Sequence, residues 1–208
     1  MDGHSTDNTY SLIKKFRSSY IVKKQKKDKN LYQAINNCIK ICKGKYILFL
    51  HCGDFFFSKN ILKLIKKKIQ LNNFNVLIGG CIFFKKGKTL RKWRIYDKEK
   101  ISFFSSYKIP HTGLVISKNL VKLIGKYNLK YQIASDTDYI LRLMQNKNLN
   151  IKICENFLLK MEYGGISTNY KNFLKKISED LIIYFKYYKK YFLIIYFFKI
   201  VFKIRQLF

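Results

Sequence analysis

The chain has 208 residues, of which 48% are hydrophobic, 17% are aromatic and one is proline. This hydrophobic fraction excludes a fully disordered chain, and the length suits one domain with a sizeable core. The formal net charge of +30 favours polyanionic partners such as nucleotide phosphates, nucleic acid or anionic lipid head groups.

The cysteines and the first residues indicate where the protein works. Five cysteines occur, at Cys38, Cys42, Cys52, Cys81 and Cys154. The number is odd and the spacing fits neither a Cys-x-x-Cys pair nor a zinc site, so we expect free thiols in a reducing compartment. Met1 is followed at once by polar residues, without the basic and apolar regions of a signal peptide. The sequence therefore predicts a cytoplasmic catalytic part.

Helical and strand patterns alternate in the first part of the chain. In chain order we predict a polar loop over 1–8, a helix over 9–18, a strand over 20–23, a helix over 30–43 and a strand over 46–50. Gly44 is expected to end the second helix in a left-handed cap. The continuous apolar run at 46–50 predicts a strand that is buried on both faces.

The middle of the chain adds further strands. We predict a helix over 58–71, strands over 76–84, 89–96 and 111–117, a helix from 135 or 136, and strands over 151–154 and 158–161. Alternation followed by clustered strands predicts an α/β fold, with a mainly parallel, Rossmann-like sheet and an antiparallel portion. Ligands of such sheets bind beyond the carboxyl ends of strands, where the polar breaks at 51–54 and 111–113 would lie.

The last segment differs in composition. From Asp180 onward nearly every residue is aromatic, aliphatic or basic. Lysines at 189, 190, 199 and 203 interrupt the run, so no apolar stretch approaches the roughly 18–20 residues that span a bilayer. We predict a C-terminal amphipathic helix that lies in the membrane interface. The alternative is a helix folded onto the domain.

Acidic residues are few, 12 against 42 basic residues, and several stand at the ends of predicted elements. Asp54 directly follows the strand at 46–50, and Asp136 opens a helix. Carboxylates at strand ends are well placed to hold a divalent cation. An aspartate at a helix start is more often a cap, so the residue types alone leave both interpretations open.

Several segments, in this order, resemble family 2 glycosyltransferases of the GT-A fold. They are DGHSTDNT at 2–9, DKNLYQAIN at 28–36, FLHCGD at 49–54, HTG at 111–113, ASDTDYILRL at 134–143 and GGIS at 164–167. The family counterparts are DGGSTDGT, DKGIYDAMN, FLNSGD, ASDYDLLLRL and GGVS. Each piece alone is unspecific, but the order and spacing make the resemblance specific over residues 1–168.

The resemblance implies roles for individual side chains. Asp2 would read the nucleobase and Asp28 would contact the nucleotide sugar. Asp54 would hold Mg²⁺ or Mn²⁺ on the diphosphate, where a cation stabilises the leaving charge. Asp136 would be the catalytic base that takes the proton of the acceptor hydroxyl. His111 would lie near the donor or acceptor sugar.

The resemblance also implies the function of the whole chain. Residues 1–168 would form a GT-A-like catalytic domain, and residues 169–208 a membrane-associated helical segment. The enzyme would transfer a sugar from a nucleotide-sugar donor to a saccharide or lipid-linked acceptor, with inversion. It would act in cell-surface polysaccharide or lipopolysaccharide assembly, peripherally at the inner face of the cell membrane.

Departures from the family pattern keep other hypotheses open. His51 and Gly53 stand where many members have the two aspartates of a DXD motif, so Asp54 is expected as the sole protein carboxylate on the metal. The family begins roughly thirty residues earlier, with a central strand and a loop that hold the nucleotide, and we do not find them before Asp2. An inactive, membrane-associated remnant is therefore the second hypothesis. A nucleic-acid-binding protein is the third, but no RNP, KH or zinc-finger pattern supports it, and we expect no nucleic acid partner.

Overall fold

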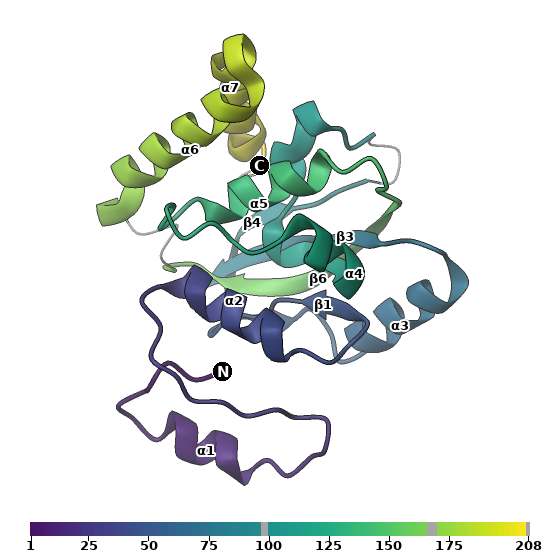
Figure 1. The fold of residues 1–208 in the computed structure, drawn as a ribbon, viewed down its shortest axis with the longest axis vertical. Helices are drawn as coiled ribbons and strands as arrows, with labels where there is room; N and C mark the ends of the chain where they lie inside the picture. Colours follow the sequence, from purple (N-terminus) through teal and green to yellow (C-terminus); the bar gives the residue numbers. More distant parts are fainter. Residues whose placement is uncertain (97–99, 166–169, 207–208) are drawn as a thin grey trace.

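The computed structural model describes residues 1–96, 100–165 and 170–206 (Figure 1). The strands are β1 (Tyr46–Leu48), β2 (Phe55–Phe56), β3 (Val76–Lys85), β4 (Lys88–Trp93), β5 (Leu114–Ser117) and β6 (Ile151–Glu162). The α-helices are α1 (Thr9–Lys15), α2 (Leu31–Ile41), α3 (Ile61–Leu71), α4 (Lys118–Ile124), α5 (Ser135–Met144), α6 (Phe173–Tyr188) and α7 (Phe192–Ile204). Short 3₁₀ helices include η1 (Phe103–Lys108), η2 (His111–Gly113), η4 (Tyr170–Asn172) and η5 (Lys189–Tyr191).

Among the described residues the strands form one sheet in the order β1-β5-β3-β6-β2, with β4 paired to β3. β3 pairs in parallel with β6, while β5 and β4 run antiparallel to β3. β1 is antiparallel to β5, and β2 to β6. The predicted α/β fold with a mixed sheet is confirmed. The antiparallel portion is larger than the sequence pattern indicates, because β5 lies between β1 and β3 and runs antiparallel to both.

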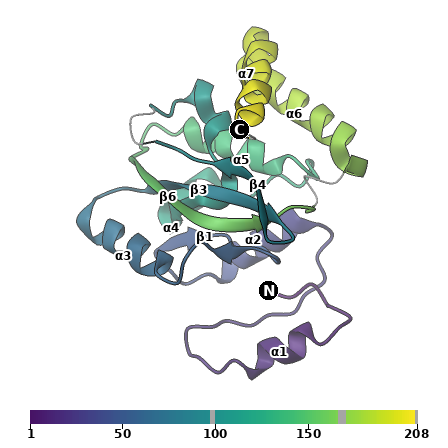
Figure 2. The same cartoon turned by 180° about the vertical axis from the view of Figure 1, so that it is seen from behind.

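The core forms on both faces of β3, whose first seven residues are all buried. Val76 and Ile78 belong to a cluster with α2, α4 and α5, the helices that cover one face of the sheet (Figures 1 and 2). Leu77 and Cys81 belong to a second cluster with α3. Successive side chains of a strand point to opposite faces, so an unbroken apolar run is what a strand between two layers requires.

Several boundaries differ from the predictions. The strand predicted at 20–23 is wrong: these residues form no strand, and Tyr20 is 95% exposed because no layer covers it. The Gly44 cap is also wrong, since α2 ends at Ile41 and Cys42 already has extended backbone. β1 is not buried on both faces either: only Ile47 is buried, because β1 ends the strand order.

The strand predicted at 111–117 begins only at Leu114, because residues 111–113 form η2, and the other elements lie close to their predicted positions. The strands predicted at 151–154 and 158–161 are the two halves of β6, and the register shifts between them, opposite Gly79 and Gly80. All five cysteines are free thiols. Cys81 and Cys154 are buried, whereas Cys52 is exposed.

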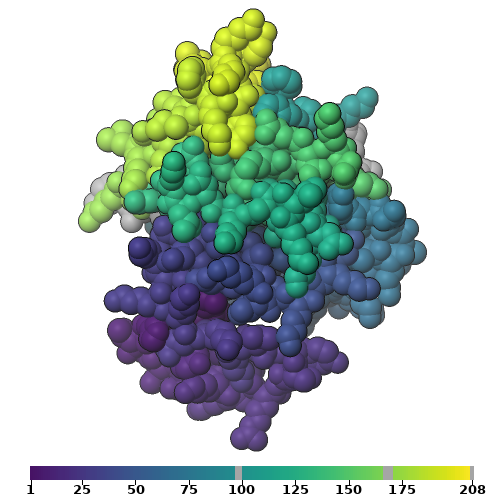
Figure 3. All heavy atoms as spheres, viewed as in Figure 1, coloured from purple at the N-terminus to yellow at the C-terminus, as the bar shows by residue number. Residues whose placement is uncertain are grey.

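The C-terminal segment is helical, but it forms two helices rather than one. The break lies at Lys189, whose φ of +49° ends α6 before η5 leads into α7. Ile183 and Tyr184 of α6 share a buried cluster with Leu141 of α5, and Ile195 of α7 joins them. The hairpin of α6 and α7 therefore packs on the domain, at the opposite end of the molecule from the N-terminal residues (Figure 3). No helix within the described residues is long and apolar enough to cross a bilayer.

The N-terminal residues lie apart from this core. None of the seven residues of α1 is buried, and a bridge between Asp2 and Gln25 closes the loop that carries it. α1 is shorter than predicted because no apolar side chain of its last residues finds a surface to cover.

Gly113 allows η2 to lie directly on the sheet, and Gly79 gives room to a neighbouring side chain. A Cβ at Gly113 would overlap the carbonyl oxygen of Gly79 in β3, and one at Gly79 would overlap the side chain of Leu158. Close backbone approach of this kind is possible only without side chains. This contact positions His111, the first residue of η2.

The substitution Gly113→Ala is expected to lower the free energy of unfolding by roughly 1–3 kcal/mol or more, because the rigid backbone of β3 must shift. Denaturant unfolding of purified protein measures the change. Gly3→Ala is the matched control, since nothing lies within 4 Å of its added Cβ. Equal stability of the two variants would contradict the proposed contact.

Candidate functional site

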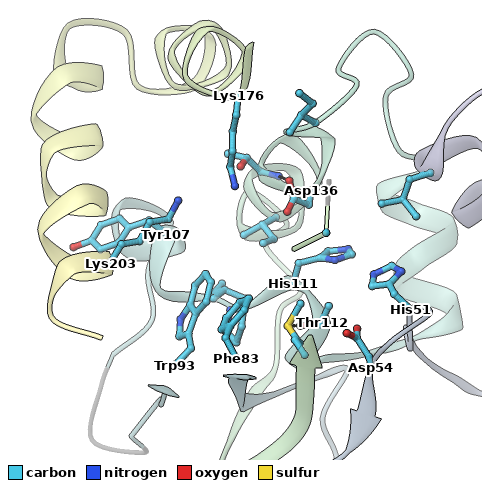
Figure 4. A pocket seen from close by; sticks show the side chains of 18 of the residues that line it. His51, Asp54, Phe83, Trp93, Tyr107, His111, Thr112, Asp136, Lys176 and Lys203 are labelled. Atoms are coloured by element: carbon cyan, nitrogen blue, oxygen red, sulfur yellow. Dashed lines mark hydrogen bonds between the residues drawn. The ribbon is translucent and has the colours of Figure 1, made fainter. Parts of the chain in front are cut away.

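A cavity of about 420 Å³ lies between η2, the start of α5 and the C-terminal hairpin (Figure 4). Asp54, from the loop between β1 and β2, and Asp136, from α5, both line it. His51 and His111 line it as well. Residues that are far apart in the sequence therefore meet in one cavity, as the predicted division into a metal ligand and a base requires.

Asp136 is the second residue of α5, where the helix dipole favours a carboxylate. Its Oδ1 accepts hydrogen bonds from the amide of Thr137 (2.9 Å) and the hydroxyl of Tyr32 (3.3 Å). Burial, together with the charge of Asp136, raises the pKa of Tyr32, so that its phenol stays protonated and remains a donor. Oδ2 makes no hydrogen bond to the residues that the structure describes, which leaves it available to a ligand.

The segment that leads into α5 is held by the C-terminal hairpin. The buried carboxylate of Glu179, in α6, accepts hydrogen bonds from the backbone amides of Gln132 (2.9 Å), Ile133 (2.8 Å) and Ala134 (2.9 Å). Its neighbour Asp180 accepts one from the hydroxyl of Thr137 (2.9 Å). α6 thereby holds the backbone before Asp136 and the side chain of Thr137 directly after it.

Sequence reasoning missed this role of the hairpin, although a signal exists. Glu179 and Asp180 are the only acidic residues after Glu162, within an otherwise basic and apolar segment. Two carboxylates in such surroundings indicate buried partners on another element.

Asp54 ends a tight loop in which Gly53 has a φ of +84°. The amide of Asp54 donates to the carbonyl of His51 (3.1 Å), but the buried Oδ2 has no hydrogen-bond partner in the described part of the chain. Burial raises the pKa of Asp54, and the nearby His51 opposes this shift. An unpartnered buried carboxylate oxygen is costly, and a bound cation would relieve that cost.

The residues fit a cation whose coordination shell is completed by oxygens of the substrate. No cluster of three or more His, Cys, Asp or Glu side chains that could hold a metal occurs in the described ranges. Mg²⁺ is commonly held by one or two carboxylates together with substrate phosphates, and a single free oxygen on Asp54 suits that arrangement. Mg²⁺ or Mn²⁺ at Asp54 stays a prediction.

His111 and His51 form a neutral wall of the cavity. Nε2 of His111 lies 2.6 Å from the hydroxyl of Tyr127, and its ring stacks on Phe49 with centroids 5.5 Å apart. Burial lowers the pKa of His111 to about 4 and also lowers that of His51. Both imidazoles are therefore uncharged at neutral pH and act as hydrogen-bonding groups rather than as cations.

The structure does not bring Asp2 and Asp28 into this cavity. The oxygens of Asp2 accept hydrogen bonds from Ser5 and Gln25, and the Ser5 hydroxyl is the main cause that lowers the pKa of Asp2. Asp28 accepts one hydrogen bond from Asn37 (2.6 Å), while its buried Oδ2 has no partner among the described residues. The nucleotide-binding roles of both residues stay predictions.

Comparison with known proteins shows the family. Residues 1–164 match the family described as glycosyl transferase family 2. The chain belongs to glycosyl transferase family 2. The part of the GGIS segment that falls on 166–167 lies outside the described residues, and the predicted boundary at 168 is untested.

Individual relatives of this family 2 chain include glycosyltransferases of Mycobacterium. It is 25% identical over 184 residues to the "PGL/p-HBAD biosynthesis glycosyltransferase" of Mycobacterium bovis BCG, covering 85% of this chain and 70% of that protein. A Mycobacterium tuberculosis protein of the same description matches equally.

Among solved structures, S. aureus TarS 1–349 in complex with UDP-GlcNAc superposes with a TM-score of 0.66 and 17% identity. The match covers 88% of this chain, which spans 56% of the TarS structure. At this identity the similarity shows the fold alone, and it supports the GT-A-like architecture of the family 2 chain.

The substitution Glu179→Gln is expected to lower the free energy of unfolding by roughly 1.5–3 kcal/mol, because hydrogen bonds to a buried charged acceptor are lost. Any activity should fall with it, since the backbone before Asp136 loses its anchor. Glu155→Gln, at an exposed position of β6, is the control. Unchanged thermal stability of Glu179→Gln would show that the three amides do not depend on this carboxylate.

Proposed function

We propose that this chain transfers a sugar from a nucleotide-sugar donor to a hydroxyl of a saccharide or lipid-linked acceptor. One observation carries the proposal: the carboxylates of Asp54 and Asp136, from separate elements, line one cavity. The UDP-GlcNAc in the TarS structure supports a nucleotide-sugar donor, and the description of the mycobacterial relatives supports a role in the synthesis of cell-surface glycans.

In this proposal Asp136 acts as the general base. Its free Oδ2 accepts the proton of the acceptor hydroxyl as the hydroxyl oxygen attacks the anomeric carbon and the bond to the diphosphate breaks. Tyr32 and the amide of Thr137 hold Oδ1, so the carboxylate is oriented before the acceptor arrives. Base and leaving group on opposite sides of the sugar favour inversion at the anomeric carbon.

Asp54 is proposed to hold Mg²⁺ or Mn²⁺, which when bound neutralises charge on the leaving diphosphate. The neutral His51, in the same loop, is placed to donate a hydrogen bond to a phosphate oxygen. Asp28 is proposed to accept a hydrogen bond from the nucleotide sugar, which its unpartnered Oδ2 supports. Asp2 is proposed to contact the nucleobase, with its carboxylate oriented by Ser5 and Gln25.

We expect Asp136→Asn to lower the transfer rate about 10²–10⁴-fold, because the amide cannot take the proton. Nucleotide binding should stay intact in this variant. Asp54→Asn should instead weaken the dependence on Mn²⁺ and raise the KM for the donor. Transfer is followed with UDP- and GDP-sugars and Mn²⁺, and Glu155→Gln is the control for a remote carboxylate.

Two other outcomes are possible in the same assay. An inactive remnant would bind no nucleotide at millimolar concentration. A general base elsewhere would leave Asp136→Asn with full activity, and either result would overturn the proposal.

We also infer that the C-terminal hairpin lies on the cytoplasmic face of a membrane. Leu193 and Phe197 of α7 are 61% and 62% exposed, and Leu174 of α6 is 78% exposed. Lys189 and Lys190 lie at the turn between the helices. Exposed apolar side chains flanked by lysines favour an anionic lipid surface, and such a position would bring the cavity near a lipid-linked acceptor.

Replacing Leu193 and Phe197 together by Asn should reduce cosedimentation with phosphatidylglycerol vesicles several-fold, because apolar area no longer enters the interface. Leu62→Asn is the matched control, since Leu62 is 58% exposed on α3, away from the hairpin. Binding to phosphatidylcholine vesicles should be weak in all variants. Equal binding of the double variant and wild type would exclude the hairpin as the contact surface.

A further inference from the structure

The cavity has a second, cationic end, formed by Arg91 of β4, Lys176 of α6, and Lys199 and Lys203 of α7. Figure 4 shows Lys176 and Lys203 on the hairpin side, with Asp136 between them and the end that carries His51 and Asp54. The cavity therefore has one end with a carboxylate and neutral imidazoles and another end with positive charges.

Asp136 and Asp180 are the carboxylates near this cationic end, and Asp180 is committed to Lys199. Asp180 pairs with Lys199 (Nζ–Oδ2 2.7 Å) and uses its other oxygen for the hydroxyl of Thr137. Among the described residues Lys203 has no ion-pair partner. A Lys203 that served only to stabilise the fold would require a carboxylate partner, because an unpaired buried charge is destabilising.

Among the described residues, no carboxylate forms an ion pair with the guanidinium of Arg91. Its guanidinium stacks over the rings of Phe83 (4.4 Å) and Trp93 (4.8 Å). The buried Nε has no hydrogen-bond partner in the described part of the chain. A planar fork that is already oriented by aromatic rings suits bidentate recognition of phosphate or carboxylate oxygens.

Burial disfavours the charged forms of Arg91, Lys176 and Lys203, and the neighbouring cations add to this effect for the two lysines. Burial, with Lys199 and Lys176 close by, lowers the pKa of Lys203 to about 7. Burial also lowers the pKa of Arg91 to about 10, and that of Lys176 falls for the same main reason. Opposing charges from Asp136 and Asp180 do not cancel these shifts for the lysines. An anion between the cations would relieve this cost.

We propose that the cationic end of the cavity binds a phosphate group of the acceptor. The assignment to the acceptor rests on the proposed function: the donor diphosphate lies at Asp54, so an anion beyond Asp136 belongs to the molecule that gives up its proton. Trp93 and Tyr107 line the cavity beside the cations, and their rings suit the sugar or polyol part of such an acceptor. The phosphate comes either from a soluble phosphorylated acceptor or from a lipid head group.

The test uses Lys203→Met in the full chain, with glycerol 3-phosphate as probe and glycerol as its uncharged counterpart. Wild type should gain thermal stability with glycerol 3-phosphate and none with glycerol. Lys203→Met should weaken binding of glycerol 3-phosphate about tenfold or more, since a hydrogen bond to a charged group is lost. Without ligand the variant should be more thermostable than wild type, because an unpaired buried charge is gone.

A merely structural Lys203 would give the opposite result, a less stable variant with unchanged affinity for glycerol 3-phosphate, and this would overturn the proposal. Arg91→Gln is a second variant with the same expected loss of affinity. Lys66→Met, at an exposed position of α3, controls for the loss of one positive charge.

Nucleotide binding separates this proposal from the proposed function. The thermal shift caused by UDP with Mn²⁺ should be the same in wild type and Lys203→Met. If Lys203→Met lost the UDP shift, the cations would belong to the donor diphosphate and the acceptor assignment would be wrong. If UDP bound and both proteins responded equally to glycerol 3-phosphate, the proposed function would stand and the phosphate site would fall.

Vesicles distinguish the two sources of phosphate. The phosphate belongs to a lipid if the protein binds phosphatidylglycerol vesicles, if this binding depends on Lys203, and if glycerol 3-phosphate does not displace the vesicles. Competition by glycerol 3-phosphate assigns it to a soluble acceptor. If glycerol 3-phosphate and the vesicles bound equally well to wild type, Lys203→Met and Arg91→Gln, the proposal would be overturned.

Discussion

The candidate site depends on one buried interaction: the carboxylate of Glu179 accepts hydrogen bonds from three consecutive backbone amides. Amides at the entry to a helix have no partners within the helix and must be satisfied from outside. Here the partner comes from α6, beyond the 1–164 region that matches the family. The position of Asp136 is therefore a property of two parts of the chain together, and the hairpin is a structural component of the cavity.

The second constraint is the close approach of η2 to β3. Gly113 has no side chain that would keep these backbones apart, and His111, in the same short helix, lines the cavity. Tyr127, Tyr139 and Tyr32 stack behind it, with centroids of Tyr127 and Tyr139 4.1 Å apart. This apolar backing keeps both histidines uncharged, so the charges that face the cavity are carboxylates at one side and cations at the other.

The positions of the charged residues show more about function than the formal net charge of +30 does by itself. Most lysines lie on solvated faces, as the scattered runs predict. A few lie where water is scarce: Lys199 is only 6% exposed and meets Asp180, while Lys203 meets no carboxylate within the described residues. Position within the fold, rather than total charge, separates the lysines that solubilise the protein from those that line the cavity.

The sequence by itself determined the α/β class, the main helices and strands of the core, and the family, because apolar periodicity and motif order are local properties of the chain. It also placed Asp54 and Asp136 at element ends. Only the tertiary structure decided that these two carboxylates share a cavity, that β5 enters the sheet in reverse, and that the C-terminal segment folds back as a hairpin. The tertiary structure also decided the cationic end of the cavity and the partners of Glu179, because each joins residues of separate elements, and no local pattern encodes which surfaces meet.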